Sequence, residues 1–92
     1  MGHPITIKIK KLSDLDLTAL NVYSWPIWSC EVSDFPWTYS DSETCLILEG
    51  KVIVTTDHEE VTIKAGDFVV FPKGLSCRWN VLQPIRKHYS FG

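Results

Sequence analysis

The chain has 92 residues, of which 45% are hydrophobic and 22% are charged. Nine basic side chains against eleven acidic ones leave a net charge of −2, which provides no electrostatic attraction to nucleic acid or to an anionic membrane. A chain of this length can bury one hydrophobic core, so we expect a single domain over residues 1–92. No apolar run approaches the ~20 residues of a membrane-spanning helix.

The cysteine pattern bears on the cellular compartment. Cys30, Cys45 and Cys77 are odd in number and show no C-x-x-C spacing. No stretch of the sequence has the apolar core of a secretion signal. Together these observations predict reduced thiols in a cytoplasmic protein.

The N-terminal part of the chain predicts one strand and one short helix. Residues Ile5 to Ile9 alternate isoleucine with polar side chains, which is typical of a half-buried strand. Ser13 can cap a helical turn that runs to about Leu20, and this is the only helical signal in the sequence. Extended structure resumes at Trp25 to Trp28, because Pro26 disfavours a helical conformation in the residue before it.

The remainder of the sequence predicts short strands separated by Gly, Pro and Asp turns. A polar hairpin tip at 57–60 follows a long segment that is interrupted at Gly50, and Pro84 separates the last two strands. The expected strands cover residues 43–56, 61–63, 68–71, 77–82 and 86–91. This arrangement indicates an all-β sandwich or barrel.

Two motifs narrow the fold further. In residues 37–50, Glu43 precedes Gly50 by seven positions, and in residues 66–81 a glycine leads into the turn Pro72-Lys73-Gly74. This spacing resembles the two motifs of the cupin superfamily. From about 25 to 89 the chain is similar to small single-domain cupins of unknown function, grouped with the ureidoglycine aminohydrolase-like and ethanolamine-utilisation-Q-like cupins. The resemblance implies a single RmlC-like jelly-roll β-barrel with one short N-terminal helical turn.

The resemblance also implies a metal site, but most of its ligands are replaced in this sequence. Trp37, Tyr39 and Cys77 stand where the family has histidines, and only the carboxylate of Glu43 is kept. Tryptophan does not bind metals, and one thiolate with one carboxylate falls short of the donors of a tight zinc site. We therefore expect no tightly bound metal and no cofactor. A depleted metal site made of Tyr39, Glu43 and Cys77 is the alternative.

If the cupin frame holds, these positions converge on a pocket at the barrel mouth. Glu43 is the candidate catalytic carboxylate, since a carboxylate among aromatic rings can transfer protons; a structural role as a buried hydrogen-bond acceptor is the alternative. Cys77 is a weaker catalytic candidate, because no histidine lies near it in sequence to activate the thiol. The expected ligand-binding residues are Trp37, Tyr39, Glu43, Cys45, Cys77, Trp79, Arg86 and His88.

The last strand can present either of two faces to the pocket. Alternation places Arg86 and His88 on one face, with Lys87 and Tyr89 on the other. If Arg86 and His88 face the cavity, an anionic ligand is favoured, because a guanidinium pairs well with a carboxylate. If they face solvent, they only form a charged final strand.

The sequence thus predicts an uncharacterised cupin that binds a small polar or anionic metabolite and leaves open whether it is an enzyme. The alternative is a non-catalytic, fully packed barrel that acts through self-association or a protein partner. Alternation from Thr44 to Leu48 leaves an apolar face opposite Glu43, which can pack under a second sheet or form a dimer interface. We expect a homodimer, because a core of this size is small.

Overall fold

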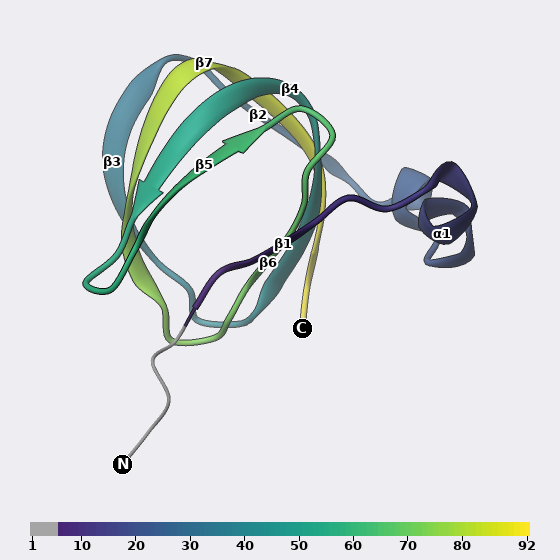
Figure 1. Cartoon of the computed structure of the whole chain (residues 1–92), viewed down its shortest axis with the longest axis horizontal. Coiled ribbons are helices and arrows are strands. Elements are labelled where there is room, and N and C mark those ends of the chain that lie inside the picture. Colours follow the sequence, from purple (N-terminus) through teal and green to yellow (C-terminus); the bar gives the residue numbers. More distant parts are fainter. Residues whose placement is uncertain (1–5) are drawn as a thin grey trace.

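Two long antiparallel strands, β4 (Glu43–Thr55) and β7 (Ser76–Phe91), pair with each other along their length and form the centre of the fold (Figure 1). The computed structural model describes residues 6–92, so Ile5 of the expected first strand lies outside the described residues. The other strands add to these two at both ends, which gives one seven-stranded antiparallel sheet. The predicted all-β class is therefore confirmed.

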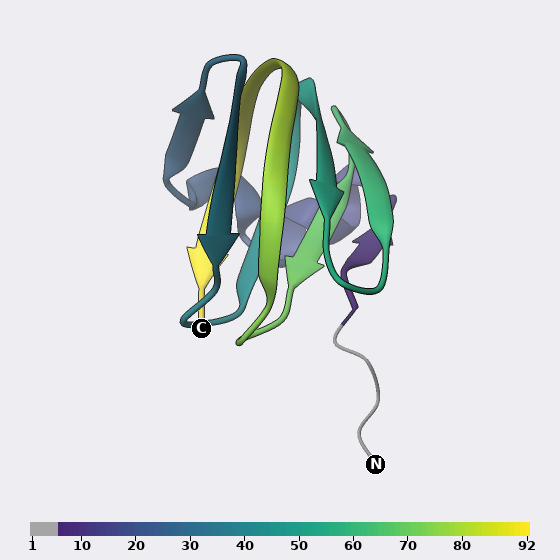
Figure 2. The same ribbon diagram turned by 90° about the vertical axis from the view of Figure 1, so that its left-hand side faces the viewer.

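Each end of the central pair has its own neighbours. Next to the start of β4 lie β6 (Phe68–Phe71) and then β1 (Lys8–Lys10), and β2 (Ile27–Cys30) pairs with the last part of β7. The second half of β4 pairs with β5 (Glu60–Lys64), and the first half of β7 with β3 (Ser33–Thr38). In Figures 1 and 2 the strands curve around a common interior. The strand order does not close on itself within residues 6–92, so the sheet agrees with a jelly roll but is not a closed barrel.

The central pair bends where Gly50 meets Pro84. The pairing of β4 with β7 shifts register between Ile47 and Val52, and β7 exchanges its partner β3 for β2 over the same stretch. Gly50 has a φ of 98°, and a Cβ atom there would lie 2.1 Å from the carbonyl oxygen of Pro84. The expected break of the last strand at Pro84 is wrong: β7 is continuous, because a proline is tolerated at a bulge where the ladder is already interrupted.

The short helix covers part of the outer face of the sheet. As predicted, Ser13 caps α1 (Asp14–Ala19), its hydroxyl accepting a hydrogen bond of 3.2 Å from the amide of Asp16. A 3-10 turn, η1 (Val22–Ser24), follows. The apolar residues that join this segment to the sheet are Leu17, Val22, Leu46 and Phe68. The apolar face opposite Glu43 is thus partly covered by the chain itself, and none of the helices in residues 6–92 is long and apolar enough to cross a membrane.

Gly50→Ala should destabilise the protein by at least ~2 kcal/mol, because the new methyl group meets the Pro84 carbonyl in a strained backbone conformation. Gly74→Ala is the matched control. Gly74 has a φ of 87°, but a Cβ atom added there would meet open space. Gly74→Ala should therefore cost only the backbone strain of ~1 kcal/mol. Urea unfolding of both variants measures the difference. Equal losses would show that the two strands do not approach closely at Gly50.

Candidate functional site

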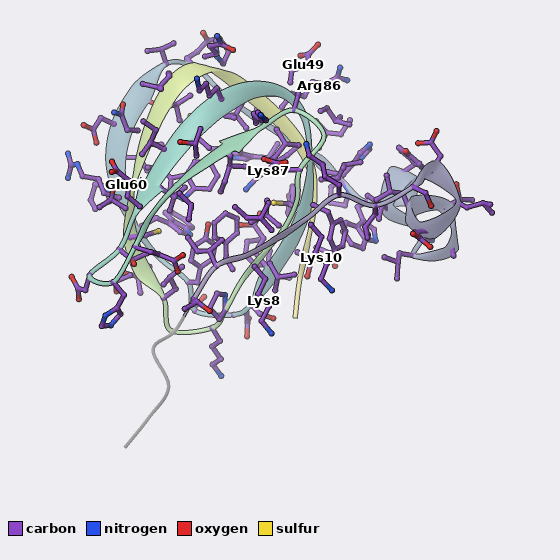
Figure 3. All side chains as sticks on the ribbon, in the orientation of Figure 1. Lys8, Lys10, Glu49, Glu60, Arg86 and Lys87 are labelled. Carbon is purple, nitrogen blue, oxygen red and sulfur yellow. The ribbon has the colours of Figure 1, made fainter. Side chains whose placement is uncertain are left out.

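A buried ion pair joins the two central strands. The ammonium nitrogen Nζ of Lys87 lies 2.7 Å from Oε2 of Glu43, and the side chains are only 6% and 4% exposed, respectively. The register pairs Lys87 with Ile47 rather than with Glu43, so the lysine side chain extends along the sheet to reach the carboxylate. Figure 3 shows Lys87 inside the curve of the sheet, whereas Arg86 and Glu49 point outward.

Aromatic rings surround the ammonium group. Lys87 Nζ lies 4.7 Å from the ring centroid of Trp79, 4.9 Å from that of Trp28 and 5.9 Å from that of Phe71. Each cation–π contact of this kind contributes about 0.5–2 kcal/mol, more when the cation is desolvated. The rings and the carboxylate together offset the loss of hydration that burying a lysine costs.

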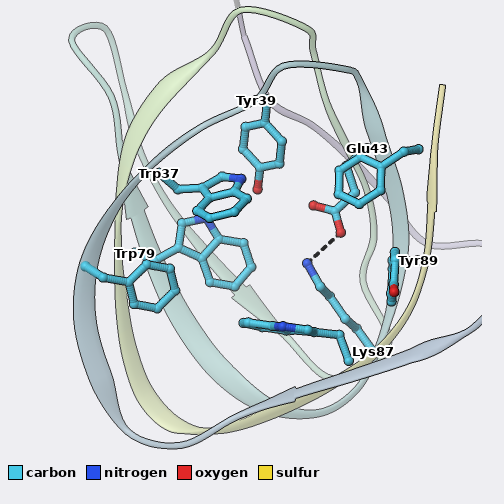
Figure 4. A pocket seen from close by; sticks show the side chains of 9 residues that line it. Trp37, Tyr39, Glu43, Trp79, Lys87 and Tyr89 are labelled. Carbon is cyan, nitrogen blue, oxygen red and sulfur yellow. Dashed lines mark ion pairs between the residues drawn. The ribbon is translucent and has the colours of Figure 1, made fainter.

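A pocket of about 240 Å³ lies against this ion pair (Figure 4). Its volume corresponds to about eight water molecules at liquid density. Within the pocket, the Tyr39 hydroxyl, the Glu43 carboxylate and the Lys87 ammonium point toward a common centre. The lining is otherwise aromatic and consists of Trp28, Phe35, Trp37, Tyr39, Glu43, Trp79, Lys87, Tyr89 and Phe91.

Two neutral polar groups belong to the same pocket. Burial, followed by the negative charge of Glu43, raises the pKa of Tyr39 far above its ordinary value, so the hydroxyl keeps its proton. The Trp79 ring is also buried. Its indole N–H is near Tyr39, yet no acceptor in residues 6–92 has the distance and angle of a hydrogen bond to it. The pocket therefore holds an unsatisfied donor beside a protonated hydroxyl.

Four of the sequence-predicted site residues line the pocket, namely Trp37, Tyr39, Glu43 and Trp79. Cys45 and Cys77 do not; both are buried in the apolar core. The Cys77 thiol donates to the carbonyl oxygen of Trp37 at 3.6 Å, and burial raises its pKa. Burial also raises the pKa of Cys45 to about 12. A protonated thiol in the core lacks the activation that the proposed nucleophilic role of Cys77 requires.

The expected placement of Arg86 and His88 at the pocket is also wrong. Arg86 is exposed on the outer surface. His88 is buried on the outer side, where its Nδ1 lies 2.8 Å from the carbonyl oxygen of Trp25 and its ring meets Tyr23 edge-on. The predicted alternation is correct, and of the two faces left open by the sequence, the one with Lys87 and Tyr89 points inward. The sequence contained a signal for this, because the same alternation places Ile85 on the face of Lys87 and Tyr89.

Trp28, Phe35 and Phe91 also line the pocket, and none of the three was predicted from the sequence. Trp28 comes from β2, which pairs with the end of β7, and Phe35 comes from β3, which pairs with its start. Both reach the pocket only because β7 bends and exchanges partners at Pro84. No local pattern in the sequence indicates that arrangement.

The residues at the position of the family's metal site do not fit a metal ion. Its three histidine positions hold Trp37, Tyr39 and Cys77, and Cys77 lies in the core. The one remaining carboxylate, Glu43, is already paired with an ammonium group. Within residues 6–92, no group of three or more His, Cys, Asp or Glu side chains is arranged to hold a metal.

Comparison with known proteins identifies the family. A family model described as the EutQ-like cupin domain matches residues 17–89. The chain belongs to the EutQ-like cupin family. It is 53% identical to a DUF861 family protein from Thermotoga maritima, whose crystal structure superposes with a TM-score of 0.92 over 95% of this chain and 100% of that one.

More distant relatives carry the name EutQ. The Clostridium difficile EutQ protein is 19% identical, with a TM-score of 0.65 over 92% of this chain and 66% of its own, which shows a shared fold. A curated relative, acetate kinase EutQ from Salmonella typhimurium, is 36% identical over 55 residues. Those residues are 60% of this chain and 24% of the relative, so the match spans about a quarter of its length.

Glu43→Gln should lower the free energy of unfolding by about 3 kcal/mol, because it leaves the Lys87 ammonium buried without its counter-charge. Chemical denaturation at neutral pH measures the loss. Glu49→Gln on the same strand is the control, and since Glu49 is exposed, its effect should stay within about 0.5 kcal/mol. A loss below ~1 kcal/mol in Glu43→Gln would mean that Lys87 does not depend on this carboxylate.

Iodoacetamide at pH 8 should modify Cys30 in the native protein well before Cys45 and Cys77. Only the thiolate reacts, and the raised pKa values of the two buried thiols leave them protonated at this pH, whereas Cys30 is half-buried. Mass spectrometry of peptides after timed labelling gives the three rates, and labelling in urea is the positive control. Equal rates at Cys77 and Cys30 would place the Cys77 thiol in an accessible pocket after all.

Proposed function

We propose that the protein binds a small polar metabolite in the pocket beside the Glu43–Lys87 pair. The observation that carries this proposal is the volume of about 240 Å³ that stays open between aromatic walls and a buried ion pair. A barrel that served only as a packed scaffold would fill this space with side chains. The alternative of a fully packed barrel therefore loses its main support.

The size and lining of the pocket limit the ligand. Pockets for drug-sized molecules usually have about 300–1,000 Å³, so this pocket suits a smaller metabolite rather than a nucleotide or a peptide. Aromatic side chains form most of its wall, which favours a ligand with a flat or apolar body. Trp37 and Phe91 are about half exposed, so the ligand would enter beside them.

The charges favour an uncharged ligand over an anionic one. An anionic ligand was expected only if Arg86 faced the cavity, and Arg86 lies outside the pocket. The one cation that lines it, Lys87, is already neutralised by Glu43 at 2.7 Å. An anionic ligand would add a second negative charge beside Glu43, and in a poorly hydrated site like charges repel strongly.

Conversion of the ligand is compatible with this pocket. The Glu43 carboxylate faces this space and can act as a general base, whereas the strongly raised pKa of Tyr39 suits its hydroxyl to donating a hydrogen bond rather than to giving up its proton. The kinase activity in the name of the curated relatives is not part of this proposal, because the matched segment is only 24% of those proteins.

Two further expectations accompany the proposal, a cytoplasmic location and a homodimer. Three free thiols favour a reducing compartment. Exposed apolar side chains around α1, η1 and β2, namely Leu15, Leu20, Tyr23 and Ile27, are suited to pairing with a second copy. Sedimentation at micromolar concentration would exclude the dimer if it gave a single species of monomer mass.

A screen of small uncharged polar compounds should yield at least one that raises the melting temperature and quenches tryptophan fluorescence, because three tryptophans line the pocket. Trp37→Ala, at the exposed mouth, should weaken that binding roughly tenfold, the equivalent of ~1.4 kcal/mol of lost contact. Trp25→Phe is the control, since Trp25 packs on the outer side. If no compound has either effect at millimolar concentration, the packed-scaffold alternative is favoured.

A further inference from the structure

The pocket has a surplus of hydrogen-bond donors. The Trp79 ring lines the pocket, and its buried indole N–H lies near Tyr39 and Cys77 without the distance and angle of a hydrogen bond to any acceptor in residues 6–92. Tyr39 retains its hydroxyl proton, and the Lys87 ammonium carries three N–H groups, of which Glu43 is positioned to accept one. The only carboxylate among the lining residues is thus already engaged.

An unsatisfied buried donor is unfavourable, and a ligand that supplies an acceptor at that place relieves the cost. Trp79 is 2% exposed, so bulk solvent does not reach its ring freely. The ring is also held in place from two sides, because Trp28 meets it edge-on at 6.0 Å and Phe35 stacks on it at 6.1 Å. A fixed N–H on a rigid wall is suited to select one acceptor position on a ligand.

The charges in the pocket limit which kind of ligand group can accept these hydrogen bonds. Glu43 and Lys87 form a neutral pair, so a carboxylate ligand would face repulsion from Glu43 as well as attraction to Lys87. A cationic ligand brings no acceptor to Trp79 and competes with Lys87 for Glu43. An uncharged carbonyl oxygen accepts from the donors without either penalty.

We infer that the pocket recognises the carbonyl oxygen of a small, flat, uncharged compound such as an amide, a lactam or a ketone. Trp79 Nε1–H donates to that oxygen and determines the specificity, while the aromatic walls contact the body of the ligand. This inference rests on the proposed function and adds to it the chemical class of the ligand.

Three probes of nearly equal shape test the inference, namely benzamide, benzoate and benzylammonium. Benzamide should bind at least roughly tenfold more tightly than the other two, since only it offers an uncharged carbonyl. The ¹H–¹⁵N spectrum of the indole groups gives a second readout. The Trp79 indole proton, identified by its loss in Trp79→Phe, should move downfield when benzamide is added to the unmodified protein.

Trp79→Phe keeps an aromatic ring and removes the donor, so it should weaken benzamide binding roughly tenfold. Trp25→Phe is the matched control and should bind benzamide normally. Tighter binding of benzoate or benzylammonium, equal binding of all three probes, or an unmoved Trp79 resonance would each overturn the inference while leaving a small-molecule pocket in place. Absence of binding by all three probes would also overturn it, and the broader compound screen then decides separately whether the pocket binds any ligand.

Discussion

The salt bridge between Glu43 and Lys87 is the constraint on which the interior of this protein depends. Removing two such charges from water costs several kcal/mol per ion unless each is held by well-placed partners. Here the carboxylate and the ammonium hold one another at 2.7 Å, and the rings of Trp28 and Trp79 lie against the ammonium. The bend of β4 and β7 gathers these side chains from three strands, β2, β4 and β7, so the fold and the site have the same physical origin.

This pair also explains how a cupin fold can be kept without the usual metal ligands. The carboxylate at position 43 still faces the interior, but its counter-charge is an ammonium group that belongs to the chain itself. The rest of the pocket is then free to be aromatic and rich in hydrogen-bond donors, with Tyr39 and Trp79 facing the same space. We expect such a pocket to select ligands by shape and by hydrogen-bond acceptors rather than by coordination.

Several features of the fold could be predicted because local physics determines them. The Ser13 hydroxyl satisfies one of the free amides at the helix start, that of Asp16, and the apolar run at 68–71 is the strand β6 at the predicted bounds. The spacing around Glu43 and Pro72 led to the family, which the match over residues 17–89 confirms. These signals lie within short segments and need no knowledge of distant contacts.

Other features depend on contacts between distant segments, and the sequence predicted them wrongly, incompletely or not at all. Pro84 predicted a strand end, because a proline interrupts the hydrogen bonds between paired strands. In the fold, Pro84 lies opposite Gly50 at a bulge where that pairing is already interrupted, so the strand continues. β3 was not predicted, since Pro36 interrupts its sequence and most of its side chains are exposed. Alternation in the last strand defined two faces, but it could not show that Lys87, rather than Arg86 and His88, points into the interior. A buried lysine becomes favourable only when Glu43 and the rings are already in place.

A double-mutant cycle on the unfolding free energy tests the role of this pair most directly. It compares the unmodified protein with Glu43→Gln, Lys87→Met and the double variant under identical conditions. We expect a coupling energy of about 2 kcal/mol or more, because either single change leaves one buried group without its partner and the second change removes that defect. Effects that add within about 0.5 kcal/mol would show that the two side chains do not depend on one another, and would contradict the account.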